Sequence, residues 1–422
     1  MSSPHPRRPQ HSDAETSDID RPGPDEVVRA LITPPRLRSD DAEATASRLE
    51  LFFDLAYVLV VLELASTFLH DLTWHGLGIF VGLFTAIWFS WVGFTLYANR
   101  FDTDDVIFRV GKLLATLAIT GCAASAGDAT ADLALPFAAS YATGMIILLL
   151  LYVRAWRHLP DARPTIAVYL ATTGTGALLW TISLPVSGPA PFVLWGLGAA
   201  VAAAGPVLAS FRDDTVPLHI EHLPERFGLL VILVLGEAVG GAATGVYDAH
   251  WAGPAIAVGI IGFAIAASMW WIYFDVIATV SSETLATTTQ EDQAPGAGAT
   301  DERHDAFIYG HLPIALGIVM TGVGIEDLVL HTDAALPSAG GWILTGGVAL
   351  FLTGAALTVG GTTRDWRTLW PWPTAAIPAV LGIAVIPHQS ALLITGLVAA
   401  ITITVAVHGT LRRRAHDLRP AR

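Results

Sequence analysis

Cysteine is almost absent from this 422-residue sequence. The single one, Cys122, lies in an apolar run. A disulfide framework needs at least two cysteines, so none is predicted, and one residue says nothing about the redox compartment. We expect Cys122 to be a small buried side chain.

Charge is also scarce. Only 14% of the residues are charged, 53% are hydrophobic, and the mean hydropathy is +0.55, values that exclude an ordinary soluble enzyme. Apolar runs of about 20 residues recur, each close to the roughly 30 Å of a bilayer core. The predicted fold is all-α, a polytopic bundle whose partner is the lipid bilayer. The net charge of −14 argues against a nucleic-acid partner.

Signatures of soluble enzymes are missing too. The sequence contains no G-x-x-x-x-G-K-[ST], no H-E-x-x-H and no G-x-S-x-G, so ATP-driven transport, zinc hydrolysis and an esterase elbow lack support. His219 and His222 have His-x-x-His spacing, but that spacing alone is weak evidence for a metal. We predict no metal and no cofactor.

The first 48 residues contain no apolar core, so no cleavable signal peptide is visible and the first span is expected to act as the targeting signal. Residues 1–47 mix prolines with both charge signs and are predicted to be a disordered cytoplasmic tail. The polar connection 281–304 is rich in small residues and is predicted to be a flexible cytoplasmic loop. Residues 411–422 form a basic cytoplasmic tail.

About twelve membrane helices are predicted, and the eleventh is short and interrupted by proline. Their expected ranges are 49–69, 76–98, 106–126, 135–156, 164–185, 190–210, 226–245, 253–280, 305–330, 341–361, 371–386 and 389–410.

The basic residues give this arrangement an orientation. All 23 Lys and Arg residues fall on one side of the twelve-helix arrangement. Positive residues favour the cytoplasmic side, so both termini are predicted to be cytoplasmic. The strong preference for Arg over Lys is associated with bacterial genomes rich in G and C. The predicted location is therefore a bacterial cytoplasmic membrane.

An internal repeat is also predicted. Glu63 in the first span recurs as Glu237 in the seventh, after similar apolar runs. This spacing divides the chain into six-helix halves, 48–215 and 216–410. An even number of spans per half means that both halves run the same way through the membrane.

Carboxylates inside spans are the main candidate site residues, because a charge in the bilayer usually faces a protein interior or a wet cavity. Glu50 and Asp54 lie on one helical face, with Arg48 near enough to help neutralise them. Glu63 and Glu237 lie deeper. Each is either a protonatable group in a pathway or a neutral side chain that locks two helices together. Small residues around Glu237 place it at a helix interface.

A second set of polar residues lies near the cytoplasmic helix ends. Asp102 and Asp275 are expected to form ion pairs there, with Arg100 or Arg226 as partner. His311, early in the ninth span, either shares a proton with Asp305 or a facing carboxylate, or is a packing residue beside a proline. The predicted cytoplasmic cluster comprises Glu50, Asp54, Asp102, His222, Glu225, Arg226 and Asp275.

Five strings, taken together, resemble the bacterial low-temperature-requirement protein A family over about residues 45–410. They are Glu-Leu-Phe-Phe-Asp-Leu (50–55), Tyr-Ala-Asn-Arg-Phe-Asp (97–102), residues 222–237 from His-Leu-Pro-Glu-Arg-Phe-Gly to Leu-Gly-Glu, Trp-Ile-Tyr-Phe-Asp (271–275) and Tyr-Gly-His-Leu-Pro (309–313). Where the family commonly has Val-Phe after Phe-Phe-Asp-Leu, this chain has Ala56-Tyr57, which leaves the carboxylates untouched.

The resemblance implies a polytopic bacterial membrane protein. The family name records a cold-growth phenotype and no reaction. The family's polar motif residues that match here are Glu50, Asp54, Asp102, His222, Glu225, Glu237, Asp275 and His311.

The leading functional interpretation is a secondary transporter of an unknown small molecule or ion, coupled to protons, with Glu63 and Glu237 as the titrating pair and His311 beside the pathway. A central cavity reaching Glu237 would favour it. The alternative is a membrane-embedded, lipid-acting enzyme or accessory factor that uses the cytoplasmic cluster. Convergence of that cluster on one cavity would favour the enzyme. A scaffolding role, in which the carboxylates matter only for folding, is the third interpretation.

Overall fold

The computed structural model describes residues 31–37, 47–211, 222–292, 300–333, 338–366, 372–387 and 390–417, and these are almost entirely helical. Eleven helices in this part of the chain are long and apolar enough to cross a bilayer. A further apolar helix, α13 (Trp372–Ala384), has 13 residues and so rises only about 20 Å. The predicted all-α membrane bundle is confirmed. Most of the predicted N-terminal tail lies outside the described residues.

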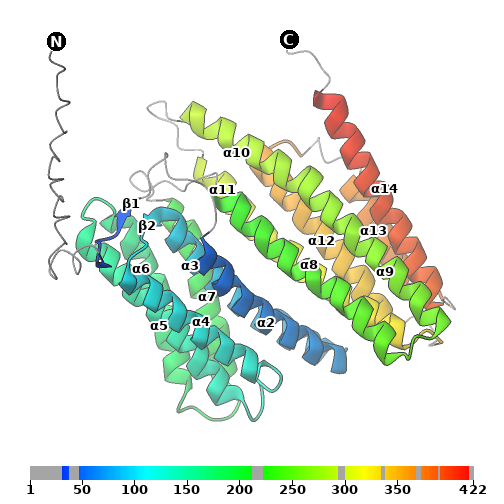
Figure 1. Ribbon diagram of the computed structural model, residues 1–422, viewed down its shortest axis with the longest axis horizontal. Coiled ribbons are helices and arrows are strands. Elements are labelled where there is room, and N and C mark those ends of the chain that lie inside the picture. Colours follow the sequence, from blue (N-terminus) through cyan, green and yellow to red (C-terminus); the bar gives the residue numbers. More distant parts are fainter. Residues whose placement is uncertain are drawn as a thin grey trace, which may run out of the picture.

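The helices form two groups, which lie on the left and right of Figure 1. The first group contains α2 (Arg48–His70), α3 (Trp74–Arg100), α4 (Val106–Ala126), α5 (Ala134–His158), α6 (Arg163–Ser183) and α7 (Ala190–Ser210). The second contains α8 (His222–Asp248), α9 (Gly253–Trp271), the π-helix η1 (Ile272–Ala278), α10 (Thr279–Asp292), α11 (Thr300–Leu330), α12 (Ala339–Thr363), α13 and α14 (Ala391–Asp417).

Three helices of the first group meet the second. Helix α2 packs against α4 and α3 on one side and against α11 and α8 on the other, while α3 and α7 also touch α11. We call the end of the bundle where α2, α4 and α8 begin the basic end, because the described Lys and Arg residues lie towards it. It is at the top of Figure 1, with the short antiparallel strands β1 (Arg36–Leu37) and β2 (Phe101–Asp102).

Local sequence explains where the helices begin. Ser47 accepts a hydrogen bond from the Glu50 amide, and Glu50 accepts one from the Ser47 amide, which forms a reciprocal capping box for α2. Thr73, Asp105 and Ser338 cap α3, α4 and α12 through side-chain oxygens. These polar residues satisfy amides that the first helical turn leaves without partners.

The predicted flexible loop at 281–304 is wrong for its described residues. Helix α9 continues through η1 into α10, so the helix that starts at Gly253 runs to Asp292, and α11 begins at Thr300. Residues 281–292 extend an existing helix, which adds one hydrogen bond per residue without a new nucleation cost. Their polar composition therefore did not make them a loop.

Among the described helices, α11 and α12 share the most extensive contact. At Gly317, an added Cβ would lie 2.5 Å from the Phe351 amide nitrogen; at Gly347 it would lie 2.6 Å from the Thr321 amide nitrogen. Similar close approaches recur every seven residues on both helices. This glycine seam comprises Gly310, Gly317 and Gly324 on α11 and Gly340, Gly347, Gly354 and Gly361 on α12. The missing side chains let two backbones touch, as in membrane helix pairs of small residues.

The predicted duplication into 48–215 and 216–410 stays a prediction. The packing into two helix groups is compatible with it, but packing alone does not establish that the two groups share one fold.

Candidate functional site

Four charged side chains are buried together near the basic end, where α2 packs against both α4 and α8. We call Glu50, Asp54, Lys112 and Arg226 the buried charge cluster. Arg226 Nη2 donates a hydrogen bond to Asp54 Oδ1 at 2.8 Å, and Arg226 Nη1 lies 4.0 Å from Glu50 Oε2. The indole of Trp91 donates to the same Asp54 oxygen at 2.9 Å. Asp54 is fully buried. The cluster therefore links the two helix groups through an ion pair shielded from solvent.

Lys112 belongs to the cluster and was not predicted from the sequence. Its side chain is fully buried, and its charge interacts with those of Glu50, Asp54 and Arg226. The ammonium nitrogen lies 3.6 Å from the ring centre of Phe53 and 4.8 Å from that of Phe94. Aromatic faces attract cations in this geometry. The signal was available, since Lys112 is the only lysine in the sequence and lies inside an apolar span.

Several polar atoms of the cluster have no hydrogen-bond partner within the described residues. They are Asp54 Oδ2, Lys112 Nζ and the Nε and Nη1 atoms of Arg226. Charged groups held out of water in this way are costly and are often found at functional sites. Two carboxylates and two basic groups give the cluster no formal net charge. The four side chains can therefore stay buried without a further counterion. Their unpaired donors and acceptors could still bind water or a polar ligand.

The sequence predicts that Arg48 helps to neutralise Glu50 and Asp54. That expectation is wrong, because Arg48 is exposed and the described ion pairs of these carboxylates are with Arg226 on α8. Glu225 lies beside Arg226 in the first turn of α8. His222 begins the same helix, and its side chain lies outside what the structure describes.

Asp102 and Asp275 are not part of this cluster. Asp102 is exposed on β2, opposite Arg36 of β1. Asp275, within η1, accepts hydrogen bonds from Arg413 at 3.0 Å and from Thr410, both on α14. The ion pair predicted for Asp275 is therefore present, but with a different partner. The structure brings together Glu50, Asp54 and Arg226 from the predicted set, and places these two aspartates elsewhere.

Glu237 faces a carboxylate that the sequence analysis did not single out. Its charge interacts with that of Glu326 on α11, and both side chains are half-buried. The two helices approach closely there. A Cβ at Gly241 would lie 3.1 Å from a Glu326 oxygen, and one at Gly322 would lie 2.9 Å from the Ala238 Cα. The structure therefore places two acids on touching faces of α8 and α11.

The glycines around Glu237 divide into two sets. Gly241 and Gly245 contact Glu326 and Val329 of α11, as expected for close helix packing. Gly236 and Gly240 face open space, because no atom of the described residues lies within 4 Å of an added Cβ. The predicted interface is confirmed for the first set and not for the second.

Glu63 does not meet Glu237. Its side chain is exposed, and one carboxylate oxygen lies 2.9 Å from the position of an added Cβ at Gly127, at the end of α4. The pairing of the two acids expected from the sequence is replaced by Glu237 with Glu326. The role of Glu63 in a pathway stays a prediction.

His311 has partners other than Asp305. Its Nε2 forms a hydrogen bond with the Tyr273 hydroxyl at 2.9 Å, and its Nδ1 lies 2.6 Å from the Phe307 carbonyl oxygen. The ring also packs against Phe227. Asp305 instead accepts from Ser210 of α7 at 3.0 Å. His311 is thus a buried side chain with both ring nitrogens in contact with polar atoms.

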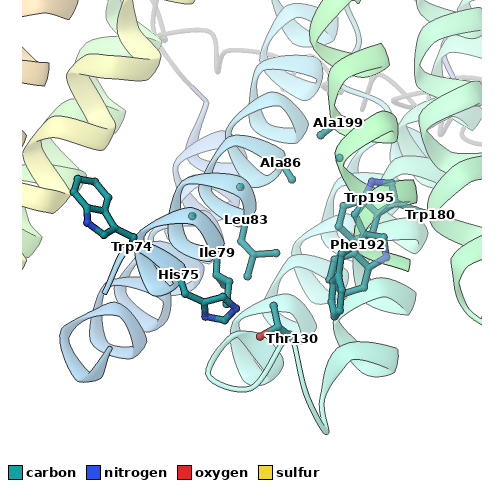
Figure 2. Close-up of a pocket in the computed structure, with 13 residues that line it drawn as sticks. Trp74, His75, Ile79, Leu83, Ala86, Thr130, Trp180, Phe192, Trp195 and Ala199 are labelled. Atoms are coloured by element: carbon teal, nitrogen blue, oxygen red, sulfur yellow. The ribbon is translucent and has the colours of Figure 1, made fainter. Parts of the chain in front are cut away.

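A cavity of about 550 Å³ lies within the first helix group, towards the end opposite the basic end (Figure 2). Its walls come from α3, α6, α7 and the turn after α4. Trp180 and Trp195 stack on one side, with Leu83 on α3 across from them. None of the predicted site residues is among the residues that line it.

Eleven long apolar helices and a buried charge cluster between two helix groups define a polytopic α-helical membrane protein with an ionic interface. Comparison with known protein families shows to which family the chain belongs. The model of the bacterial low temperature requirement A protein (LtrA) matches residues 45–407, so the chain belongs to this family. The resemblance predicted from the sequence motifs is confirmed.

One curated relative carries no assigned activity. The chain is 28% identical over 334 residues to "Uncharacterized protein RA0937" of Rhizobium meliloti (strain 1021), which covers 73% of this chain and 77% of that protein. No solved structure was found to match the chain. The comparisons thus identify the family and leave the activity open.

Proposed function

We propose that this protein is a secondary transporter of a small molecule or ion, in which the two helix groups move relative to one another. The observation that carries the proposal is the buried charge cluster, which joins α2 and α4 to α8 across the interface between the groups. Ionisable residues inside membrane segments are costly and commonly lie along substrate or ion pathways. A protein that needed only a tight bundle could fill this position with apolar side chains.

The Asp54–Arg226 pair acts in this proposal as the closure of the interface at the basic end. The pair is buried, and Asp54 accepts a hydrogen bond from Trp91. Phe227, next to Arg226, packs edge-on against the same indole. Opening this end would expose both charges to water, which would compensate for the lost ion pair. Rocking of two bundles around such an interface is the usual form of alternating access.

Glu237 and Glu326 act in this proposal as the proton-carrying pair. A carboxylate charge in the bilayer needs a cation or a proton. The charge of Glu326 opposes that of Glu237, and the charge of Asp248 opposes that of Glu326. A shared proton would resolve the conflict, and a substrate cation could displace it. The His70 side chain at the end of α2 interacts with Glu326, which extends polar groups towards the end opposite the basic end.

The cavity of Figure 2 gives no support to this pathway, because neither Glu63 nor Glu237 lines it. The alternative of a lipid-acting enzyme has less support than transport. It required Asp102 and Asp275 to converge with Glu50 and Asp54, whereas their partners lie on β1 and α14.

The test uses the full chain in liposomes that contain a pH-sensitive dye. A pH gradient is imposed, and pools of amino acids, sugars, organic cations and metal ions are added in turn. We expect at least one pool to accelerate dissipation of the gradient. Glu237→Gln and Glu326→Gln should each reduce that acceleration at least tenfold, since an amide cannot carry the proton.

Glu283→Gln is the matched control, because Glu283 is exposed on α10 far along the chain from both acids. It should leave the flux unchanged. Equal flux in wild type and Glu237→Gln would remove this residue from the mechanism. If none of the pools accelerated dissipation of the pH gradient through the wild-type protein, proton-coupled transport would be rejected.

A further inference from the structure

We propose that the cavity between α3, α6 and α7 binds one acyl chain of a membrane lipid, taken from the leaflet at the end opposite the basic end. The headgroup would lie at the mouth, beside His75 and Thr130. This site is separate from the buried charge cluster and from the acids of α8 and α11.

The length of the cavity along α3 fits one acyl chain. Trp74 and His75 mark the mouth, where α3 begins, and Ala86 marks the deep end on the same helix. Twelve residues of helix separate Trp74 from Ala86, which is about 18 Å. One leaflet of a bilayer core is about 15 Å thick, half of roughly 30 Å. The cavity therefore reaches about as deep as an acyl chain does.

The walls are apolar and aromatic. The Trp180 and Trp195 rings stack with centroids 4.8 Å apart, and Phe192 packs edge-on against Trp195. Leu83 and Ile79 face them from α3 (Figure 2). Such surfaces bind hydrocarbon and offer little to a polar solute. The volume of about 550 Å³ lies in the range of small-molecule sites.

Glycines keep the cavity open. Gly78 and Gly82 on α3 and Gly196 on α7 all line it, and at each of them an added Cβ would meet no atom of the described residues within 4 Å. Larger side chains at these positions would enter the cavity without striking the backbone. The missing side chains at these three positions on facing helices therefore leave the cavity unfilled.

The polar atoms at the site match an amphipathic ligand. His75 is exposed at the mouth, 3.8 Å from Asp71, and can contact a headgroup. The other polar groups of this wall are turned inward: Trp180 is fully buried, and the indole N–H of Trp195 donates to Ser183.

The test uses full-length protein in liposomes that contain phosphatidylglycerol with a diazirine in one acyl chain. After illumination, labelled peptides are mapped by mass spectrometry. We expect the label to concentrate on the segments of α3, α6 and α7 that line the cavity. Gly82→Leu and Gly196→Leu, which fill it, should each reduce that label at least fivefold.

Gly396→Leu is the matched control, because Gly396 on α14 also has open space around an added Cβ and lies outside the cavity. It should not change labelling of α3, α6 or α7. Label spread evenly over all exposed helices, and unchanged in both filled variants, would mean bulk-lipid contact only and would overturn the proposal. The labelling assay does not depend on flux, so it can fail or succeed independently of the proposed transport.

Discussion

Asp54 shows what the buried charge cluster requires at the scale of single residues. It has no exposed surface, and its ionised form depends on the hydrogen bonds from Arg226 and Trp91. Removing one member of a buried ion pair leaves the other charged and without a partner, which costs more than removing both. The net contribution of the pair to folding is therefore best measured by removing its members singly and together.

We expect Arg226→Met to destabilise the protein by about 3–5 kcal/mol, because Asp54 and Glu50 lose the cation that they contact. The double variant Asp54→Leu/Arg226→Met should recover most of that loss, since Glu50 and Lys112 still balance one another. Chemical unfolding of the purified protein in detergent measures both. A double variant no more stable than Arg226→Met would contradict the ion-pair explanation.

Arg109→Met provides the exposed comparison. Arg109 forms a 2.7 Å ion pair with Asp104, and both side chains are exposed. Hydrogen bonding from Arg109 holds the pKa of Asp104 below its ordinary value. The stabilisation is therefore present above the ordinary pKa of an aspartate and is lost as the pH falls through the lowered one. Solvent screens such pairs, so we expect no measurable change at neutral pH.

The sequence predicted part of this site and could not predict the rest. Spacing along one helix showed that Glu50 and Asp54 share a face, because helical period is a local property. The partner on α8 depends on tertiary packing, which no local spacing reveals. Glu326 carried the same signal as Glu237, an acid in an apolar span, and was overlooked.

At the scale of elements, the α11–α12 pair is set by the glycine seam. Contacts at intervals of seven residues on two antiparallel helices keep one face of each turned to the other over their whole length. Backbone contact leaves no room for even a methyl group at the central positions. The pair is therefore expected to move as one rigid unit.

We expect Gly317→Val to prevent stable folding, because its Cβ would lie 2.5 Å from the Phe351 amide nitrogen and the two helices would have to separate. Gly396→Val, at an open position on α14, should retain the wild-type unfolding temperature. Size-exclusion chromatography after heating compares the two in detergent. A Gly317→Val variant as stable as Gly396→Val would show that the seam tolerates separation.

Helix boundaries were predicted well where an apolar run ends at a turn. They were predicted poorly where a helix continues into polar residues. The first seven spans agree with α2 to α8 to within a few residues. The eighth continues as a π-helix and a polar helix, which hydropathy alone does not detect. The seven-residue glycine period was present in the sequence and is the signal that could have predicted the α11–α12 contact.

At the scale of the whole molecule, the proposed transport requires the helix groups to separate at the basic end. Ser210 of α7 donates to Asp305 of α11 at 3.0 Å, so these positions bridge the two groups. We expect Ser210→Cys/Asp305→Cys to form a disulfide on oxidation and to lose at least tenfold of the coupled flux, with recovery on reduction. Dye-loaded liposomes measure the flux, and thiol titration measures the bond.

The native thiol will not interfere, because Cys122 is fully buried, as predicted from the sequence. The single variant Ser210→Cys is the control and should transport with or without oxidant. Undiminished flux in a fully oxidised double variant would mean that transport does not require the two helix groups to separate at the basic end.

The distance in sequence between Asp54 and Arg226 also constrains biosynthesis. The two are 172 residues apart, so at ordinary rates of synthesis α2 leaves the ribosome about 10–30 s before its counter-charge exists. Lys112 is synthesised early in that interval, on a helix that packs against α2. The nascent first helix group therefore has its own cation for these acids, and Arg226 joins that arrangement when the second group arrives.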